Sequence, residues 1–297
     1  MNNILIYIGA AVILLALLAT AAEVQRELHS FKVTHYHVTS RKLSGLNRPL
    51  TILFLSDLHN WRYGEKNERL LRAIENEHPD LILIGGDMLV GKEGTPYDTA
   101  LDLIRRLPAL CPVYYANGNH EQRMKEETEI YGDTYNIYKR KLEDSGVIFL
   151  ENDARRIRMG RTGISINGLE LPCSVYTKFQ KAQITEETIS AMLGEPDRCY
   201  SILLAHNPAY MDAYLKWGAD LVLSGHLHGG LIRLPLIGGA VTPQGFFFPK
   251  YSGEMTREGE QAVIVSRGLG THTINIRFMN TPELISIHLD AEPPYPL

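Results

Sequence analysis

Cysteine is scarce in this chain of 297 residues, and neither sign of charge dominates it. The three cysteines (Cys111, Cys173 and Cys199) are scattered without C-x-x-C spacing, so we interpret them as small buried side chains in a reducing compartment. Lys and Arg number 30 against 34 Asp and Glu, and the signs are interspersed. No nucleic-acid partner is expected without a basic surface. Internal repeats are also lacking, which excludes a repeat architecture.

One long uncharged run is present near the N-terminus. Residues 4–22 contain no charge, and nineteen residues of helix just span a bilayer core of about 30 Å. A transmembrane anchor, a cleavable signal peptide and a buried core helix all fit such a run. Its length and position disfavour the core helix. The first three residues carry no basic charge, which disfavours a signal peptide, although residues 19–21 resemble a cleavage site. We expect an uncleaved single-pass anchor.

Short apolar runs recur through the first two thirds of the chain. They occur at residues 51–56, 81–84, 113–116, 201–204 and 221–223 and are nearly unbroken, which is typical of strands buried on both faces. Residues 65–77 and 97–107 have apolar side chains at helical spacing. Strand and helix therefore alternate, and the fold class is predicted as α/β.

Potential metal ligands follow these runs in five short blocks. The blocks are Asp57-Leu58-His59, Gly86-Asp87, Gly118-Asn119-His120-Glu121, Ala205-His206-Asn207-Pro208 and Gly225-His226-Leu227-His228-Gly229-Gly230. They contain carboxylates, amides and five of the eleven histidines, enough oxygen and nitrogen ligands for two divalent cations. Because ligands in open α/β sheets bind beyond the carboxyl ends of strands, we expect the blocks to converge.

The order of the blocks resembles the calcineurin-like metallophosphoesterase superfamily. That pattern runs D-x-H, G-D, G-N-H-E/D, a lone H and G-H-x-H, and here it covers residues 50–230. With the apolar N-terminal segment, the chain is similar to the membrane-anchored branch that includes UDP-diacylglucosamine hydrolases. Many relatives carry a second Asp three residues after the Asp of the second block, whereas Val90 stands there in this chain. That departure affects a supporting hydrogen bond and no metal ligand.

The resemblance implies a role for each block. Asp57, His59 and His228 would hold one metal, Asn119, His206 and His226 the other, and Asp87 would bridge them. A hydroxide between the metals would be the nucleophile. His120 matches a histidine that in relatives protonates the leaving oxygen or stabilises the transition state, and Glu121 would orient His120 or a neighbouring ligand.

The ligand set and the resemblance together suggest the cofactors and the substrate class. Oxygen and imidazole ligands without thiolate suit Mn²⁺, with Fe²⁺ or Zn²⁺ as alternatives, while Mg²⁺ fits four histidines poorly. The expected substrate is a phosphodiester or pyrophosphate at the membrane, linked to a lipid or a nucleotide. The aromatic loop at residues 236–251, with Phe246, Phe247 and Phe248, either lines a lipid-facing cleft or packs as a buried cluster. His272, between glycine-rich residues, is a further candidate for substrate contact.

The second half of the chain predicts a mixed architecture. Residues 155–159 and 164–167 flank a turn and indicate a hairpin, residues 185–193 and 209–216 are predicted helices, and residues 262–266 and 283–288 are predicted strands. This mixture matches the family's four-layer αββα sandwich of two mixed β-sheets flanked by helices. We expect an anchor at 1–25, a juxtamembrane segment and first strand at 26–49, the catalytic domain at 50–290, and a loose proline-rich tail at 291–297.

Two questions stay open at the level of sequence. Lys and Arg are absent before the apolar run, whereas Arg26, Lys32, Arg41 and Lys42 follow it. The positive-inside rule therefore places the catalytic domain in the cytoplasm, although some similar phosphoesterases are exported. The second question is catalysis itself, since some proteins of this fold are inactive scaffolds that bind other proteins. The complete set of blocks favours a hydrolase.

Overall fold

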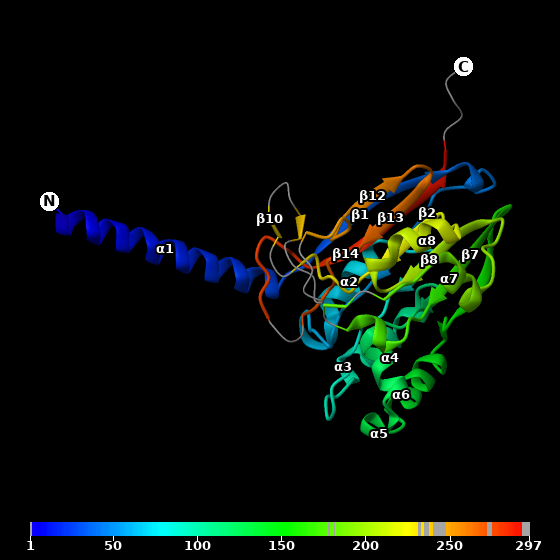
Figure 1. Cartoon of the computed structure of the whole chain (residues 1–297), viewed down its shortest axis with the longest axis horizontal. Helices are drawn as coiled ribbons and strands as arrows, with labels where there is room; N and C mark the ends of the chain where they lie inside the picture. The colour runs from blue at the N-terminus through cyan, green and yellow to red at the C-terminus, as the bar shows by residue number, and fades with distance from the viewer. Residues whose placement is uncertain are drawn as a thin grey trace, which may run out of the picture.

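Two six-stranded mixed sheets pack face to face in the computed structural model, with helices on both outer faces (Figure 1). This arrangement confirms the four-layer sandwich predicted from the sequence. The structure describes residues 2–177, 179–180, 182–230, 233–234, 238–239, 248–271 and 275–292. The proline-rich tail from residue 293, His272, and Phe246 with Phe247 lie outside the described residues.

The first sheet has the order β1-β14-β2-β3-β4-β5. Its strands are β1 (Lys32–Ser40), β2 (Leu50–Leu55), β3 (Leu81–Ile84), β4 (Val113–Tyr115), β5 (Val147–Phe149) and β14 (Glu283–Ala291). Strands β2 to β5 are parallel, and β14 is antiparallel to β2. Because β1 pairs with β14 over its whole length, the segment just after the apolar helix is an edge strand of this sheet.

The second sheet has the order β12-β13-β9-β8-β7-β6. Its strands are β6 (Asp153–Met159), β7 (Thr162–Leu169), β8 (Tyr200–Ala205), β9 (Leu221–Ser224), β12 (Met255–Glu258) and β13 (Gln261–Val265). Strands β6 and β7 form the predicted hairpin, and β7, β8, β9 and β13 are parallel. A short pair, β10 (Arg233–Leu234) and β11 (Gly238–Gly239), lies apart from both sheets.

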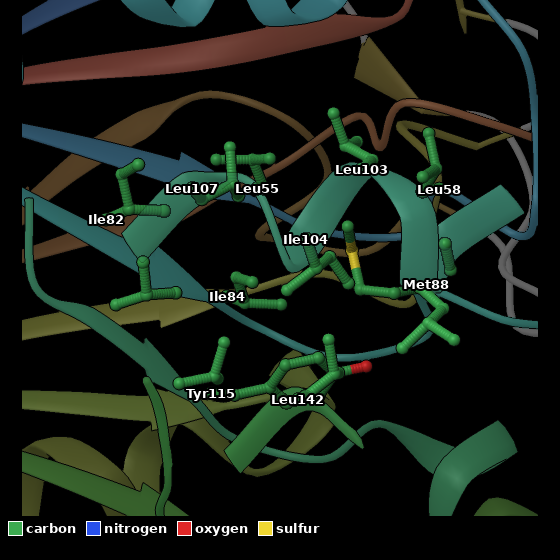
Figure 2. Close-up of a cluster of buried hydrophobic side chains, with 14 of the residues drawn as sticks. Leu55, Leu58, Ile82, Ile84, Met88, Leu103, Ile104, Leu107, Tyr115 and Leu142 are labelled. Carbon is green, nitrogen blue, oxygen red and sulfur yellow. The ribbon is translucent and has the colours of Figure 1, made fainter. Parts of the chain in front are cut away.

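The central strands are buried on both faces, which explains their unbroken apolar runs. In β2, Ile52 and Phe54 point between the sheets, whereas Leu53 and Leu55 pack under the helices of the first sheet. Those helices include α2 (Glu68–Asn76), α3 (Asp98–Ile104) and α6 (Thr134–Glu143). Figure 2 shows part of this outer cluster, in which Ile84 of β3 lies near Ile104 of α3. On the second sheet, α7 (Glu186–Leu193) and α8 (Met211–Trp217) cover the outer face.

Helix boundaries differ from the sequence prediction where local chemistry intervenes. The helix expected at 65–77 is a 3₁₀ turn, Glu65–Asn67, followed by α2, because Lys66 and Asn67 have φ of 49° and 59°. The helix expected at 97–107 ends at Ile104, and a second 3₁₀ turn contains Pro108, which disfavours a helical residue before it. Further 3₁₀ turns are Arg41–Leu43, Cys173–Tyr176 and Pro208–Tyr210. The sequence did not indicate α4 (Asn119–Glu126) or α5 (Thr128–Tyr131), which lack an apolar stripe.

Helix α1 (Asn2–Leu28) extends away from the sandwich (Figure 1). It is long and apolar enough to cross a membrane. Side chains from Ile4 to Leu18 are exposed, which argues against the buried core helix considered above. Its last turn does contact the domain: Glu27 and Leu28 are buried, and the indole N–H of Trp61 donates to the Leu28 carbonyl at 2.9 Å.

Replacement of Phe54 tests the packing between the sheets. Phe54 is fully buried in the cluster between them, so Phe54→Ala should lower the free energy of unfolding by about 3–5 kcal/mol through lost burial and a cavity. Phe179→Ala is the matched control, since Phe179 is 76% exposed and its loss should change stability by less than about 0.5 kcal/mol. Urea unfolding of the detergent-solubilised protein measures both. Equal stability losses in the two variants would contradict this packing.

Candidate metal centre

The five sequence blocks converge at one edge of the sandwich, where parallel strands of both sheets end. Strands β2, β3 and β4 lead into the first three blocks, and β8 and β9 lead into the last two. Several of the candidate ligands turn the chain sharply with left-handed backbone angles: Asp57 (φ 55°), His59 (47°), Asp87 (54°), His226 (68°) and His228 (51°). Such angles are costly for residues other than glycine, so the surrounding contacts must hold them.

Asp57, His59 and His228 form the first group of potential ligands, and all three are buried. The Nε2 atoms of the two histidines are 3.1 Å apart, and Asp57 Oδ1 lies 3.5 Å from His228 Nε2. Ligand atoms about 2.1 Å from a common cation are themselves roughly 3 Å apart. The spacing in this group therefore suits one divalent ion.

Asp87 lies at the middle of the cluster. Its Oδ2 is 3.1 Å from His206 Nε2, 3.8 Å from His59 Nε2 and 3.9 Å from His120 Nε2. Asp87 belongs to two further groups with metal-binding spacing, one with His206 and His226 and one with His59 and His120. Because His59 is also a member of the first group, the sites share their central residues.

Hydrogen bonds on the far side of two imidazoles orient their lone pairs into the cluster. His206 Nδ1 is 2.7 Å from the Gly85 carbonyl, and His228 Nδ1 is 3.1 Å from the Gly270 carbonyl. A carbonyl only accepts, so each Nδ1 carries a proton, and when the imidazole is neutral its lone pair is on Nε2 and is directed at the site. The buried Oδ1 of Asn119 accepts no hydrogen bond within the described part of the chain. These donors fit a pair of divalent cations.

Direct hydrogen bonds connect the blocks across the two sheets. Asp57 accepts from Ser56 Oγ at 2.5 Å and from the His226 backbone N–H at 2.9 Å. Asp87 Oδ1 accepts from the His120 backbone N–H at 2.8 Å, which leaves Oδ2 facing the histidines. Asp87 is thus oriented through Oδ1 and offers Oδ2 to the site, whereas Asp57 is held through both oxygens and faces His228 with Oδ1.

Glu121 holds the second block against the third. Its fully buried carboxylate accepts the backbone N–H groups of Asp87, Met88 and Gly118 at 2.8, 2.9 and 3.0 Å, and the Tyr115 hydroxyl at 2.7 Å. Burial, together with the nearby charge of Asp87, raises the pKa of Glu121 to about 7. Glu121 therefore orients the loop that carries Asp87.

The backbone of Gly91 orients the imidazole of His120. The Gly91 N–H donates to His120 Nδ1 at 2.8 Å, so a neutral His120 carries its proton on Nε2, the atom nearer to Asp87. A Cβ at position 91 would come within 2.5 Å of the His120 carbonyl oxygen, so the contact requires glycine. This N–H supports His120 in a chain that has Val90 where many relatives have aspartate.

Burial of two carboxylates sets the electrostatics of the cluster. Burial, with the charge of Asp87 acting in the same direction, raises the pKa of Asp57 to about 6. Burial would also raise the pKa of Asp87, but the nearby histidines, His206 first, hold it well below its ordinary value. Burial opposes a charge on His206 as well, yet Asp87 raises the pKa of His206 to about 10. A proton on His206 balances Asp87 here, and a bound cation would displace it.

Some residues that shape the site escaped the sequence analysis. Arg277, fully buried, donates to the Gly270 carbonyl at 2.7 Å, and the ring of Tyr176 meets His226 edge-on with centroids 5.1 Å apart. No local pattern marks either residue. Gly86 of the G-D block, in contrast, is visible in the sequence pattern. The structure explains why glycine is needed there, because a Cβ on Gly86 would lie 2.0 Å from the Gly118 nitrogen.

Where they are described, the remaining histidines and the aromatic loop add no residue to the groups with metal-binding spacing. The rings of His35 and His37 of β1 stack with the ring of His288 of β14. Their centroids are 5.7 and 4.9 Å from the centroid of His288. In the loop at 236–251, Phe248 is 57% exposed, whereas Tyr251 is buried in the cluster under α8. The described part of the loop thus contains both an exposed and a packed aromatic side chain.

Comparison with known proteins gives the family. Residues 50–230 match the model of the calcineurin-like phosphoesterase family. The chain is 26% identical to the uncharacterized metallophosphoesterase YkoQ of Bacillus subtilis (strain 168), over 87% of this chain and 90% of the relative. It is 27% identical to the phosphodiesterase YaeI of Escherichia coli (strain K12), over 81% and 82%. A solved structure, phosphopantetheinyl hydrolase from Mycobacterium tuberculosis, has 14% identity and a TM-score of 0.46, covering 76% of this chain and 91% of that one.

The family match spans all five blocks, and its members are hydrolases of phosphoric esters. The Asp and His residues of those blocks are close enough together to bind metal ions. The chain therefore belongs to the calcineurin-like phosphoesterase family and is a metal-dependent phosphoesterase.

Proposed function

We propose that the protein is a dinuclear metallohydrolase that cleaves a phosphodiester or pyrophosphate at a membrane surface. The observation that carries this proposal is the position of Asp87 Oδ2, within 4 Å of the Nε2 atoms of His59, His120 and His206. A carboxylate shared by two ligand groups is the arrangement that a bridged pair of cations requires.

The proposed ligand sets follow the geometry of the cluster. Asp57, His59 and His228 hold one ion. His206 and His226 hold the other, together with the amide oxygen of Asn119. Asp87 would bind both ions. Manganese is the proposed metal, with iron or zinc as the alternatives, because the set combines carboxylate and amide oxygens with imidazole and has no thiolate.

The chain's own residues prepare this site for phosphoryl transfer. When bound, two divalent cations would lower the pKa of a water molecule and offset the phosphate charge. Ser56 and the His226 N–H fix the orientation of Asp57, and Glu121 fixes the loop of Asp87. These contacts place the ligands before substrate arrives, so little reorganisation is needed during the reaction.

His120 is proposed to act on the leaving oxygen through Nε2. Since Gly91 donates to Nδ1, the proton of a neutral His120 is on Nε2 and faces the cluster. That N–H can donate to the oxygen that gains negative charge as the ester bond breaks. Its contribution should grow with the pKa of the leaving alcohol.

The position of α1 supports a lipid-linked substrate. If residues 4–22 cross the bilayer core, the six residues from Glu23 to Leu28 extend about 9 Å beyond it, which is the depth of the headgroup layer. Leu28 accepts a hydrogen bond from Trp61, two residues after the ligand His59. A phosphoester could therefore reach the site while its acyl chains remain in the bilayer. The basic residues after α1 favour a cytoplasmic domain.

A protein-binding scaffold is the alternative function. It has no need for seven ligand positions and His120 within one buried cluster, and the convergence of these residues favours hydrolysis. Metal analysis of the purified protein, with a screen of phosphodiesters and phosphomonoesters in manganese, separates the two functions. A scaffold would bind no metal and turn over no substrate.

Loss of the bridge should abolish hydrolysis. Asp87→Asn removes the negative charge shared by both ions, so activity should fall to background and the metal content should drop from two ions to one or none. Metal analysis and hydrolysis of a soluble phosphodiester measure this. Asp102→Asn is the control, because Asp102 is exposed on α3 and pairs only with Arg105 among the described ion pairs. Full activity with two metals in Asp87→Asn would remove Asp87 from the site.

His120→Ala should separate chemistry from metal binding. Both metals should stay bound, while the rate on an alkyl ester with a poor leaving group should fall by about 10² to 10⁴. A nitrophenyl ester should lose less, because nitrophenolate leaves with little help. His35→Ala, on the exposed edge strand, is the control. Loss of a metal, or equal slowing of both esters, would refute the assignment.

The anchor should matter only for membrane-embedded substrate. A chain that begins at Arg26 keeps all five blocks and should hydrolyse soluble esters at the full rate. Its rate on a phospholipid ester in vesicles should fall relative to the full chain, because tethering raises the effective concentration at the surface. The two substrates are compared for both chains under the same metal concentration.

Fractionation and protease treatment of intact cells test the placement itself. The full chain should remain uncleaved in the membrane fraction and resist external protease. Digestion of the domain, or a mature N-terminus at residue 22 or 23, would contradict the cytoplasmic anchor. An unchanged rate on vesicles for the chain that begins at Arg26 would contradict the role of tethering.

A further inference from the structure

The last turn of α1 contains a buried carboxylate that the proposed chemistry does not use. Glu27 is 1% exposed, although it stands where an apolar helix meets the domain. Both of its oxygens accept the Asn280 backbone N–H at 2.9 Å, and Oε1 also accepts the Thr281 hydroxyl at 3.0 Å. A buried charge is costly unless it is well hydrogen-bonded, so these contacts fix the position of Asn280.

Asn280 in turn holds the segment that carries His228. Its amide nitrogen donates to the carbonyls of His228 and Gly230, each at 2.6 Å. The packing is tight, because a Cβ on Gly229 would lie 2.3 Å from Asn280 Oδ1. Both hydrogens of one fully buried amide are thus used to clasp a single turn of the fifth block.

The clasped turn requires support. His228, Gly229 and Gly230 have successive φ values of 51°, 71° and 75°. Three successive left-handed residues do not form a regular helix or strand. The first of them, His228, is not glycine, so its backbone angles are energetically costly. The Nε2 of His228 lies 3.1 Å from His59 Nε2, so a small shift of this turn would change the spacing of the first ligand group.

We propose that Glu27 is a positioning residue for the metal centre and acts through Asn280 on His228. The last turn of the membrane helix is then part of the scaffold of the active site. This inference rests on the proposed role of His228 as a ligand. It predicts that Glu27 affects the affinity of the protein for one of the two metal ions, even when no lipid substrate is present.

Manganese titration of the metal-free full chain in detergent tests the inference. Glu27→Ala should weaken one of two binding events by about 10- to 100-fold, the usual effect of removing a residue that orients a ligand. Asn280→Asp, which keeps the shape but removes both donors, should weaken the same event. The double variant should lose no more manganese affinity than the single variant that loses more, because both changes break the same chain of contacts. At saturating manganese, hydrolysis of a soluble phosphodiester should return toward the wild-type rate.

Two further variants separate positioning from general stability. Glu23→Ala is the matched control, since Glu23 lies one turn earlier on α1 and its carboxylate bonds Arg26. It should leave both affinities unchanged. Glu27→Gln keeps an acceptor for the Asn280 N–H and should be intermediate. It also decides the question if Glu27→Ala does not fold.

Each outcome of the titration has a distinct meaning. Lower thermal stability of Glu27→Ala with unchanged manganese affinity would make Glu27 merely structural and overturn the inference. Equal losses in Glu23→Ala and Glu27→Ala would also overturn it. A wild-type chain that binds no manganese, iron or zinc would refute the proposed metal centre itself. Two metal sites whose affinities do not change in the Glu27 variants would refute only the role of Glu27.

Discussion

The structure of this site depends on two carboxylates buried where the sheets meet. Asp57 and Asp87 are almost completely shielded from solvent, and an uncompensated negative charge at such a place would be expensive. In Asp87 the His120 N–H satisfies Oδ1 and histidines surround Oδ2. In Asp57 the Ser56 hydroxyl satisfies Oδ2, and Oδ1 accepts the His226 N–H and faces the histidines. The fold can carry this charge only because its parallel strands end at one edge and bring five separate loops together. A pair of cations would complete the same balance.

Local signals in the sequence predicted the α/β class and the loops that carry the potential ligands, and the resemblance of the five blocks to the family implied the four-layer sandwich. Strands buried on two faces are unbroken apolar runs, and the ligand blocks follow them directly, as Asp57 follows β2 and Asp87 follows β3. Helix α4 was not indicated because its residues are polar and its role is to present Asn119 and His120. Its start did have a local signal, since Glu121 reaches back to the Gly118 N–H.

The contacts that position the ligands were beyond sequence reasoning. Asn280 lies 253 positions after Glu27 and 52 positions after His228 in the sequence. No periodicity relates the three residues. Arg277 lies in a segment without a regular element, and its Nη2 reaches the site both at His228 Nδ1, 3.4 Å away, and at the Gly270 carbonyl. Local patterns report burial and turn chemistry, whereas such links exist only once both sheets and α1 are packed.

The backbone N–H of Gly91 determines which nitrogen of a neutral His120 carries the proton. With Val90 in place of a carboxylate, Nδ1 receives the Gly91 N–H and the proton is directed to Nε2. A carboxylate at that place would instead accept from Nδ1–H, favour the imidazolium and supply a stronger acid. The backbone donor favours a neutral imidazole that gives a hydrogen bond without full proton transfer. Of the two roles proposed for His120, this geometry favours stabilisation of charge on the leaving oxygen.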